Sequence, residues 1–215
     1  MRLTLAFVVG MLFLRVWDPW PVETLRLKYF DTLFSLKDPK PSDYLAIYDI
    51  DEKALEERGQ WPWPRQDLAQ LNQQLLEQGA SAVVYTVLFP ETDRFGGDAA
   101  FASSMESLPT FLSAVAIQDK KLQGWHTGVA MMGPVKESVL QYPGILPNVP
   151  SLQAAAVGTG IVNSSPEVDG LVRRVPMLVR VGEELYPALG LDVLRGLAGD
   201  PSYQVKASEA GVQAV

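Results

Sequence analysis

Apolar residues dominate the start of the chain. Residues 3–14 form an apolar run with only two interruptions, and Asp18 with the nearby prolines ends it sharply. The run is shorter than the roughly 20 residues that span a bilayer, and no small-residue cleavage pattern follows it. Because no amphipathic face marks it as a surface helix, we expect residues 1–20 to be a membrane anchor that is incomplete at its start. The alternative is a buried helix of a soluble protein.

A segment whose apolar residues have helical spacing follows this expected anchor. Between Val22 and Leu36 the apolar residues recur at spacings of three and four, which predicts an amphipathic helix. A charged, proline-rich stretch then runs to Asp43. We therefore expect residues 21–43 to form a juxtamembrane helix and a connector. Two roles suit this helix: packing on the following domain, or coupling that domain to the membrane through a dimer contact.

Residues 44–89 predict a strand, a helix and a second strand. Residues 44–50 are a compact apolar run with the length of a buried strand. A helical stripe of leucines follows between residues 65 and 79, and residues 80–89 form a second apolar run. This order predicts a βαβ unit with parallel strands and a right-handed crossover.

The rest of the chain alternates short apolar runs with turns. Strands are expected at 110–117, 125–132, 157–162, 171–181 and 203–207, and helices at 99–106, 151–156 and 187–198. Residues 133–150 contain four prolines and are expected to be a loop. The predicted fold class is α/β, with a mixed, partly parallel sheet, a βαβ unit flanked by helices, and antiparallel hairpins in the C-terminal half. Residues 44–215 are expected to form this domain.

A stiff aromatic loop lies inside the predicted crossover. Residues 59–65 read G-Q-W-P-W-P-R, and each proline fixes φ and removes a backbone donor. Ligands bind beyond the carboxyl ends of parallel strands, so a ligand site is expected at this edge. The residues predicted to bind a ligand there are Asp49, Asp51, Trp61, Trp63, Arg65, Thr86 and Asp98. A buried Arg65 is also expected to pair with an aspartate such as Asp49 or Asp98.

The composition excludes several classes of function. A formal net charge of −7 and a pI near 4.8 argue against a nucleic-acid partner, because phosphate binding needs clustered Lys and Arg. Without cysteine there is no disulfide, thiolate metal site or cysteine nucleophile. The single histidine, His126, lies in a predicted strand and supports neither a serine triad nor a zinc site. Gly158 and Gly160 form a lone G-x-G at the start of a strand, not a phosphate loop.

One enzymatic alternative remains. Asp49 and Asp51 would point to the same side at the end of a strand, where they could hold Mg²⁺ while Thr86 binds a phosphate oxygen. This arrangement resembles haloacid-dehalogenase-like phosphatases, but Glu52 and Lys53 follow where those enzymes use Gly and Thr. Asp51 also suits the N-cap of a short helix. We therefore expect no enzyme here and assign no catalytic residue, metal or cofactor.

Six segments of the chain form a specific combination. They are W-D-P-W-P-V-E-T-L-R-L-K-Y-F-D at 17–31, the run with Asp49 and Asp51, G-x-W-P-W-P-R at 59–65, V-L-F-P-E at 87–91, Asp98 before a helix, and D-G-L-V-R-R-V-P at 169–176. Together they resemble the second type of CHASE domain, whose name stands for cyclases/histidine kinases associated sensory extracellular. The resemblance covers about residues 17–199. Its structural marker positions here are Gly59, Pro62, Pro64, Asp169, Gly170, Arg173 and Arg174.

The resemblance implies a ligand-sensing domain outside the cytoplasmic membrane of a bacterial receptor. Such a domain binds a small molecule, here unknown, and signals to a nucleotide cyclase, or to a histidine or Ser/Thr kinase. It implies a homodimer at the cell inner membrane that faces the periplasm or exterior. Thr86 stands where the family usually has an aspartate, which is a departure at the expected site. A module that only dimerises is the remaining alternative.

Overall fold

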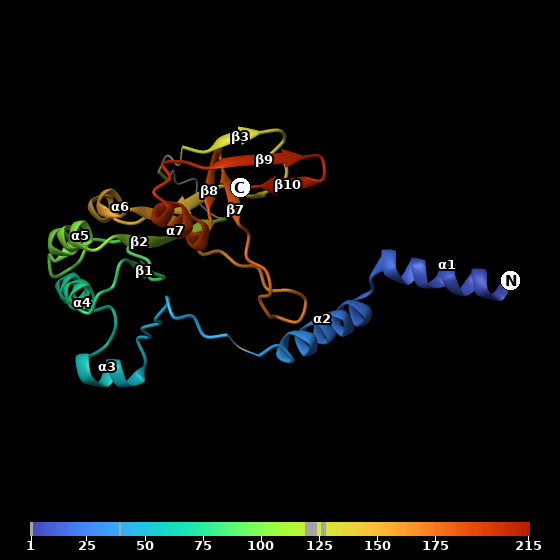
Figure 1. Ribbon diagram of the computed structural model, residues 1–215, viewed down its shortest axis with the longest axis horizontal. Coiled ribbons are helices and arrows are strands. Elements are labelled where there is room, and N and C mark those ends of the chain that lie inside the picture. Colours follow the sequence, from blue (N-terminus) through green and yellow to red (C-terminus); the bar gives the residue numbers. More distant parts are fainter. Residues whose placement is uncertain (1, 39, 119–123, 126–127) are drawn as a thin grey trace. The chain divides into compact units, whose positions relative to one another are not determined.

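The computed structural model describes residues 2–38, 40–118, 124–125 and 128–215. The chain divides into two compact units (Figure 1). The N-terminal unit consists of residues 1–51 and 166–173, and the main unit consists of residues 52–165 and 174–215. Two segments that are distant in the sequence therefore meet within the N-terminal unit.

Two helices of 16 residues each form most of the N-terminal unit, α1 (Arg2–Trp17) and α2 (Trp20–Ser35). Asp18 between them has a left-handed φ of 39° and Pro19 is extended, so the helical path breaks where the sequence predicts. Nη2 of Arg26 donates to Asp18 Oδ2 across this break at 2.6 Å. None of the described helices is both long and apolar enough to cross a membrane.

Residues 44–50 do not form the predicted strand. They adopt no regular secondary structure, and the side chains of Tyr44, Leu45, Ile47 and Tyr48 are 64% to 96% exposed. An apolar run becomes a strand only where a neighbouring strand satisfies its backbone N–H and C=O groups. No described strand pairs with this segment. The prediction of a βαβ unit that begins at residue 44 is therefore wrong.

The βαβ unit of the main unit lies later in the chain than predicted. β1 (Val83–Tyr85) and β2 (Thr110–Ile117) are parallel neighbours, and α5 (Asp98–Ser107) connects them. β6 (Gly158–Ile161) also pairs in parallel with β2, whereas β5 (Gly144–Leu146) pairs with it antiparallel. β2 is buried along almost its whole length, as expected for a central strand.

Three helices pack next to one another at one end of this sheet (Figure 1). α4 (Arg65–Glu77) contacts α5, and α5 contacts α6 (Pro150–Ala155). The short helix α3 (Glu52–Arg58) precedes the proline-rich loop that leads into α4. Their shared core contains the fully buried side chains of Leu68, Phe89, Phe101, Met105, Leu112 and Leu152.

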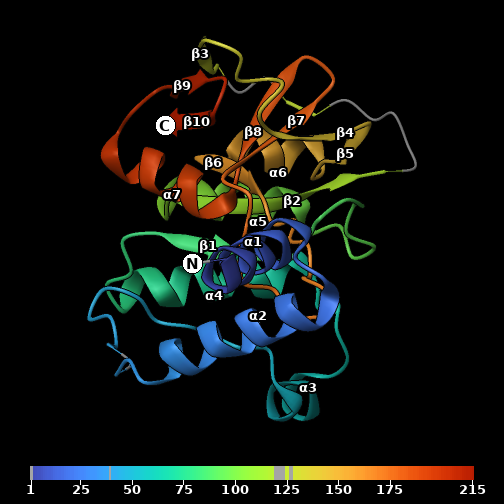
Figure 2. The same ribbon diagram turned by 90° about the vertical axis from the view of Figure 1, so that its right-hand side faces the viewer.

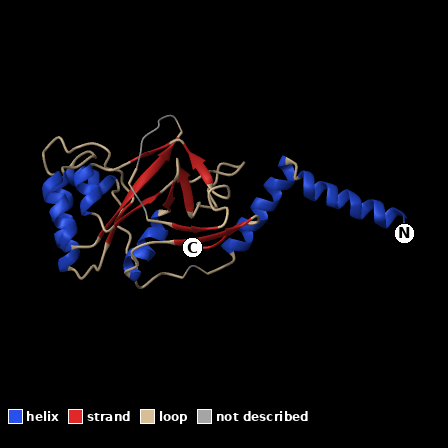
Figure 3. Cartoon of the chain, turned by 90° about the horizontal axis from the view of Figure 1, so that it is seen from above, coloured by secondary structure: helices blue, strands red, loops and turns tan. Residues whose placement is uncertain are grey.

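Two further sheets of three strands complete the main unit. The first consists of β3 (Ala130–Met132), β9 (Gln204–Ser208) and β10 (Gly211–Ala214), and the second of β4 (Leu140–Tyr142), β7 (Leu178–Val181) and β8 (Glu184–Pro187). β9 is parallel to β3 and antiparallel to β10, while β7 is parallel to β4 and antiparallel to β8. The predicted fold class, mixed α/β with parallel pairs and antiparallel hairpins, is confirmed (Figure 3).

Several predicted boundaries shift. The stretch 133–150, predicted to be a loop, contains β4 and β5. The strand predicted at 171–181 begins only at Leu178. The helix predicted from Pro187 begins at Leu189, because Pro187 is the last residue of β8. His126 lies outside the described residues.

The last helix, α7 (Leu189–Ala198), contacts β2 and β6 (Figure 2). Gly160 permits this approach, because a Cβ there would lie 2.2 Å from Leu189 Cα. The buried residues of α7 are Leu189 and Asp192, whereas the leucines at 194 and 197 are exposed. The helix thus presents a carboxylate, rather than a continuous leucine stripe, to the interior of the unit.

We predict that Gly160→Ala lowers the free energy of unfolding by about 1–3 kcal/mol, since the added methyl group meets backbone atoms. Urea unfolding followed by circular dichroism measures this change. Gly190→Ala is the matched control within α7. Nothing lies within 4 Å of its added Cβ, so it should stabilise by about 0.5–1 kcal/mol. Equal unfolding midpoints for the two variants would contradict the close packing of α7 on β6.

Candidate functional site

Arg65, the first residue of α4, lies in a polar cluster of the main unit. Its Nε lies 3.7 Å from Asp98 Oδ1, and its Cζ lies 4.4 Å from the centre of the Phe89 ring. The predicted pairing of Arg65 with Asp98 is confirmed. Burial lowers the pKa of Arg65, while Asp98 and Asp93 act in the opposite direction. The Arg65 side chain is only 9% exposed, so the carboxylates of Asp98 and Asp93, rather than water, balance its charge.

Asp93 completes this cluster, although the sequence did not single it out as a site residue. Its Oδ2 accepts from the backbone N–H groups of Arg65 and Gly97, both at 3.0 Å, and its Oδ1 accepts from that of Phe95 at 3.2 Å. Its own N–H donates to Asp98 Oδ2 at 2.9 Å. Burial alone would raise the pKa of Asp93, but these backbone donors lower it below its ordinary value. Asp93 thereby satisfies an N–H group at the start of α4.

In the loop before Arg65, the indole N–H of one tryptophan forms a hydrogen bond within the loop. Trp63 Nε1 donates to the backbone oxygen of Gly59 at 2.8 Å, and Gly59 has a φ of 90°. The rings of Trp61 and Trp63 meet edge to face at 5.7 Å, and Trp61 packs against the core. The Trp61–Pro62 peptide bond is cis. These contacts support an architectural role, and ligand binding by the two tryptophans stays a prediction.

The other predicted ligand residues lack the expected setting. Asp49 and Asp51 belong to the N-terminal unit and follow no strand, so the strand-end arrangement that the magnesium hypothesis requires does not form. Thr86 is exposed directly after β1 in the main unit. Among the described residues, no group of three or more His, Asp or Glu side chains could hold a metal ion.

Arg173 holds three carboxylates in the N-terminal unit. Its Nε and Nη2 donate to the two oxygens of Asp31 at 2.8 and 2.6 Å, and its Nη1 and Nη2 donate to those of Asp169 at 2.9 and 2.6 Å. Nη1 also donates to Glu167 Oε2 at 3.1 Å. The hydrogen bonds from Arg173 lower the pKa of Asp31 and lower that of Asp169 to about 2. The same bonds raise the pKa of Arg173.

This arrangement explains the D-G-L-V-R motif. Gly170 has a φ of 82°, and its N–H donates to the backbone oxygen of Glu167, which closes a turn. The N–H of Leu171 donates to Asp169 Oδ1 at 3.2 Å. Arg173 then joins this turn to Asp31 of α2, 142 residues away in the sequence. Two of the motif segments identified in the sequence, 17–31 and 169–176, therefore meet through one guanidinium.

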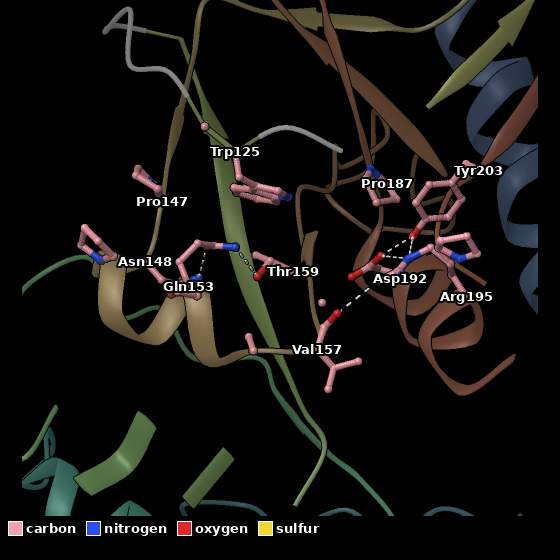
Figure 4. A pocket seen from close by; sticks show the side chains of 16 residues that line it. Trp125, Pro147, Asn148, Gln153, Val157, Thr159, Pro187, Asp192, Arg195 and Tyr203 are labelled. Atoms are coloured by element: carbon pink, nitrogen blue, oxygen red, sulfur yellow. Dashed lines mark hydrogen bonds and ion pairs between the residues drawn. The ribbon is translucent and has the colours of Figure 1, made fainter. Parts of the chain in front are cut away.

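A cavity of about 610 Å³ lies in the main unit (Figure 4). α7 contributes Asp192 and Arg195, the residues before β9 contribute Tyr203, and α6 contributes Gln153. Trp125 forms a further part of the wall. The volume falls within the range of small-molecule sites. The other lining residues are Gly124, Pro147, Asn148, Pro150, Ala154, Ala156, Val157, Gly158, Thr159, Pro187 and Pro201.

Asp192 is the most constrained polar group of the cavity. Its side chain is 5% exposed, and its Oδ1 accepts from Arg195 Nε at 2.8 Å and from the Tyr203 hydroxyl. Its Oδ2 is buried and receives no hydrogen bond from any described residue. The hydrogen bond to Asp192 raises the pKa of Arg195, and burial, followed by that same carboxylate, raises the pKa of Tyr203. One oxygen is thus fixed by the protein and the other is left without a donor.

The amide side chains that line the cavity are hydrogen-bonded within the protein. Gln153 Nε2 donates to Thr159 Oγ1 at 2.8 Å. Asn148 Nδ2 donates to the backbone oxygen of Ser113 at 2.9 Å, and its Oδ1 accepts from the N–H of Phe89 at 3.1 Å. These side chains brace the wall opposite Asp192 (Figure 4). Among the described residues that line the cavity, Asp192 therefore carries the side-chain oxygen that is buried without a hydrogen bond.

Sequence reasoning missed this cavity. Asp192 and Arg195 interrupt the leucines of α7 three residues apart, and this polar pair within an apolar helix was the available signal. Gly158 was the second signal, because a Cβ there would lie 2.0 Å from Asp192 Oδ2. The G-x-G pair of Gly158 and Gly160 thus makes room for α7 and its carboxylate.

The family model of the CHASE2 domain matches residues 3–212 of this chain. Since the match spans nearly the whole sequence, the chain belongs to the CHASE2 domain family, and the resemblance seen in the sequence motifs is confirmed. CHASE2 domains are sensory domains, typically extracytoplasmic sensors of cyclase and kinase receptors. No curated protein and no solved structure gives a significant match.

Arg65→Met tests the architectural role of the first cluster. It should lower the free energy of unfolding by about 2 kcal/mol, because Asp98 loses its buried cation. Removing one partner of a fully buried ion pair costs about 3–5 kcal/mol, and the cost here is smaller because Asp98 is 16% exposed. Urea unfolding measures the effect. Arg94→Met, which removes an exposed arginine stacked on Phe95, is the control and should change stability by less than about 0.5 kcal/mol. An unchanged midpoint for Arg65→Met would refute the architectural role.

Arg173→Met should remove a pH-dependent contribution to the N-terminal unit. The pKa of Asp169 is lowered from 3.8 to about 2 in the folded chain. The stabilisation is therefore complete above about pH 4 and is lost as the pH falls through about 2. Hydrogen exchange of the Gly170 and Leu171 N–H groups should be slower in the wild type than in Arg173→Met at pH 5, and the difference should shrink toward pH 2. Arg15→Met, which removes an exposed arginine from α1 of the same unit, should behave as the wild type. A difference that persists unchanged at pH 2 would contradict this account.

Proposed function

We propose that this CHASE2 domain is the extracytoplasmic ligand-sensing domain of a bacterial transmembrane receptor. It signals to a cytoplasmic output domain, for which a nucleotide cyclase is the first expectation and a histidine or Ser/Thr kinase the second. Residues 1–20 anchor it in the cell inner membrane, and the domain faces the periplasm or the exterior. The intact receptor is a homodimer. Membership of a sensory family supports this proposal.

The observation that carries the proposal is the cavity of about 610 Å³ in the main unit. Its volume is that of a small-molecule site. Polar side chains that the protein itself holds in place, those of Asp192, Arg195 and Gln153, line it together with the aromatic rings of Trp125 and Tyr203. A module that only dimerises has no need of such a cavity, whereas a small-molecule sensor does.

The covalent path of the chain supports a route from the cavity to α2. Thr159 of β6 lines the cavity, and only residues 162–165 separate β6 from the segment 166–173 of the N-terminal unit. In that segment Arg173 binds Asp31 of α2. A ligand that changes the equilibrium position of β6 can therefore act on α2 through this turn. It can do so only if it binds the two positions with different affinity.

Thermal unfolding of the chain with a library of small polar metabolites tests the sensing function. At least one compound should raise the melting temperature by several degrees, because a ligand at 100 times its Kd stabilises by about 2.7 kcal/mol. Ala154→Trp places a large ring against the cavity wall and should abolish the shift. Ala99→Trp is the matched control, since Ala99 is an exposed helical alanine that does not line the cavity, and it should retain the shift.

Two outcomes would overturn the sensing function. If no compound stabilises the chain while the protein forms a stable dimer, the domain is a dimerisation module. If the chain hydrolyses a generic phosphate ester with Mg²⁺, and Asp49→Asn loses this activity, it is a phosphatase.

A further inference from the structure

We infer that α2 forms the dimer contact of the N-terminal unit, and that it packs antiparallel against α2 of a second copy of this chain. The contact is an exposed apolar stripe along α2 and its C-cap. The side chains of the stripe are 37% to 75% exposed, and they are Val22, Leu25, Tyr29, Leu33 and Leu36. This inference rests on the homodimer of the proposed function and specifies the surface that forms it.

The opposite side of α2 is already packed within its own unit. Leu27 is only 6% exposed, and Asp31, four residues later, accepts from Arg173 with both carboxylate oxygens at 2.8 and 2.6 Å. Because an α-helix turns by about 100° per residue, Leu27 and Asp31 lie on one side of α2 and the stripe lies on the other. The helix is therefore held on the turn at 166–173 by one side and presents a second apolar side to its surroundings.

The spacing of the stripe is symmetric about Tyr29. Its members follow one another at intervals of three, four, four and three residues. In an antiparallel pair with Tyr29 on the twofold axis, Leu25 faces Leu33 of the second copy and Val22 faces Leu36. Each side chain thus meets an apolar side chain, and one patch serves both copies, as an isologous interface requires. The opposed helix dipoles also favour this arrangement.

The area of the stripe suits a modest, reversible contact. From the exposed fractions, with about 200 Å² for a tyrosine and about 100 Å² for an aliphatic side chain, each copy offers about 400 Å² of apolar surface. The total of about 800 Å² lies at the low end for specific interfaces. Two chains anchored in one membrane meet at a high effective concentration, so a contact of this size is sufficient.

A second copy fits the stripe better than a lipid surface does. Helices that lie on a membrane carry an excess of Lys and Arg beside their apolar side, which attracts them to anionic lipids. α2 has no such excess, because its two acidic side chains balance its two basic ones: Glu23, Asp31, Arg26 and Lys28. Its apolar stripe therefore lacks the electrostatic attraction to an anionic bilayer.

Cysteine crosslinking of the whole chain in mild detergent tests the arrangement, because the chain has no cysteine of its own. With a short bismaleimide, Tyr29→Cys should form a crosslinked dimer, and so should a mixture of Leu25→Cys and Leu33→Cys. Leu25→Cys by itself should not, since its two copies lie about 12 Å apart along the helix axis. Crosslinking of Leu25→Cys alone with the yield of Tyr29→Cys would overturn the antiparallel arrangement.

Leu25→Ser tests whether the stripe drives association. Sedimentation of the whole chain should show a dissociation constant at least about tenfold higher, because each dimer loses two leucines. Lys28→Ser is the matched control, since it introduces the same residue at an exposed position of α2 outside the stripe, and it should associate as the wild type does. Equal dissociation constants for the two variants would overturn the contact. If circular dichroism shows that Leu25→Ser does not fold, the crosslinking decides.

The failure of this contact can be told from the failure of the homodimer. A dimer that neither crosslinks at residue 29 nor weakens in Leu25→Ser would keep the homodimer and overturn the contact through α2. A monomeric chain would overturn both. In a monomer, quenching of a fluorophore on Tyr29→Cys by nitroxide lipids would place the stripe on the membrane. Protection of that cysteine from maleimide would instead place it against the chain itself. The sensing function is tested separately, by the ligand screen with Ala154→Trp.

Discussion

The carboxylate of Asp192 is the interaction on which the main unit depends. It is almost fully buried on α7, and a buried charge is tolerated only with a partner. Arg195 supplies the opposite charge from the next turn of the same helix, and Tyr203 supplies a hydrogen bond from the segment before β9. Gly158 and Gly160 let β6 come close enough to seat the helix and its carboxylate. Helix α7, strand β6 and the segment before β9 therefore all meet at the Asp192 carboxylate.

Three arginines of the described residues, Arg65, Arg173 and Arg195, each lie against at least one aspartate. Arg173 binds three carboxylates, and Arg65 lies beside Asp98 with Asp93 completing the cluster. Asp98 Oδ1 also lacks a hydrogen bond among the described residues, but it faces Arg65 Nε at 3.7 Å. Asp192 Oδ2 is buried next to Gly158. Each of the three clusters therefore organises the elements around it.

Local patterns in the sequence predicted much of the fold, and non-local contacts account for the errors. The break at Asp18, the helix that follows it and the central strand β2 depend on neighbouring residues, and they form where predicted. Residues 44–50 have the composition of a strand, but strand formation also requires a partner that the pattern cannot specify. The sequence predicted the pairing of Arg65 with Asp98, and the family motifs drew attention to Arg173. The further partners Asp93 of Arg65 and Asp31 of Arg173, which are 28 and 142 residues away, could not be predicted from local patterns.

Asp192 was overlooked because the leucines around it suggest an apolar face, whereas two of them are exposed and the aspartate is buried. The central claim is that the Asp192 carboxylate holds α7 to the elements around it. The most direct measurement is urea unfolding of Asp192→Asn beside Asp200→Asn, which removes an exposed carboxylate. We predict that Asp192→Asn lowers the free energy of unfolding by about 2 kcal/mol, because Arg195 loses its buried partner, while Asp200→Asn changes it by less than about 0.5 kcal/mol. Equal unfolding midpoints for the two variants would contradict the claim.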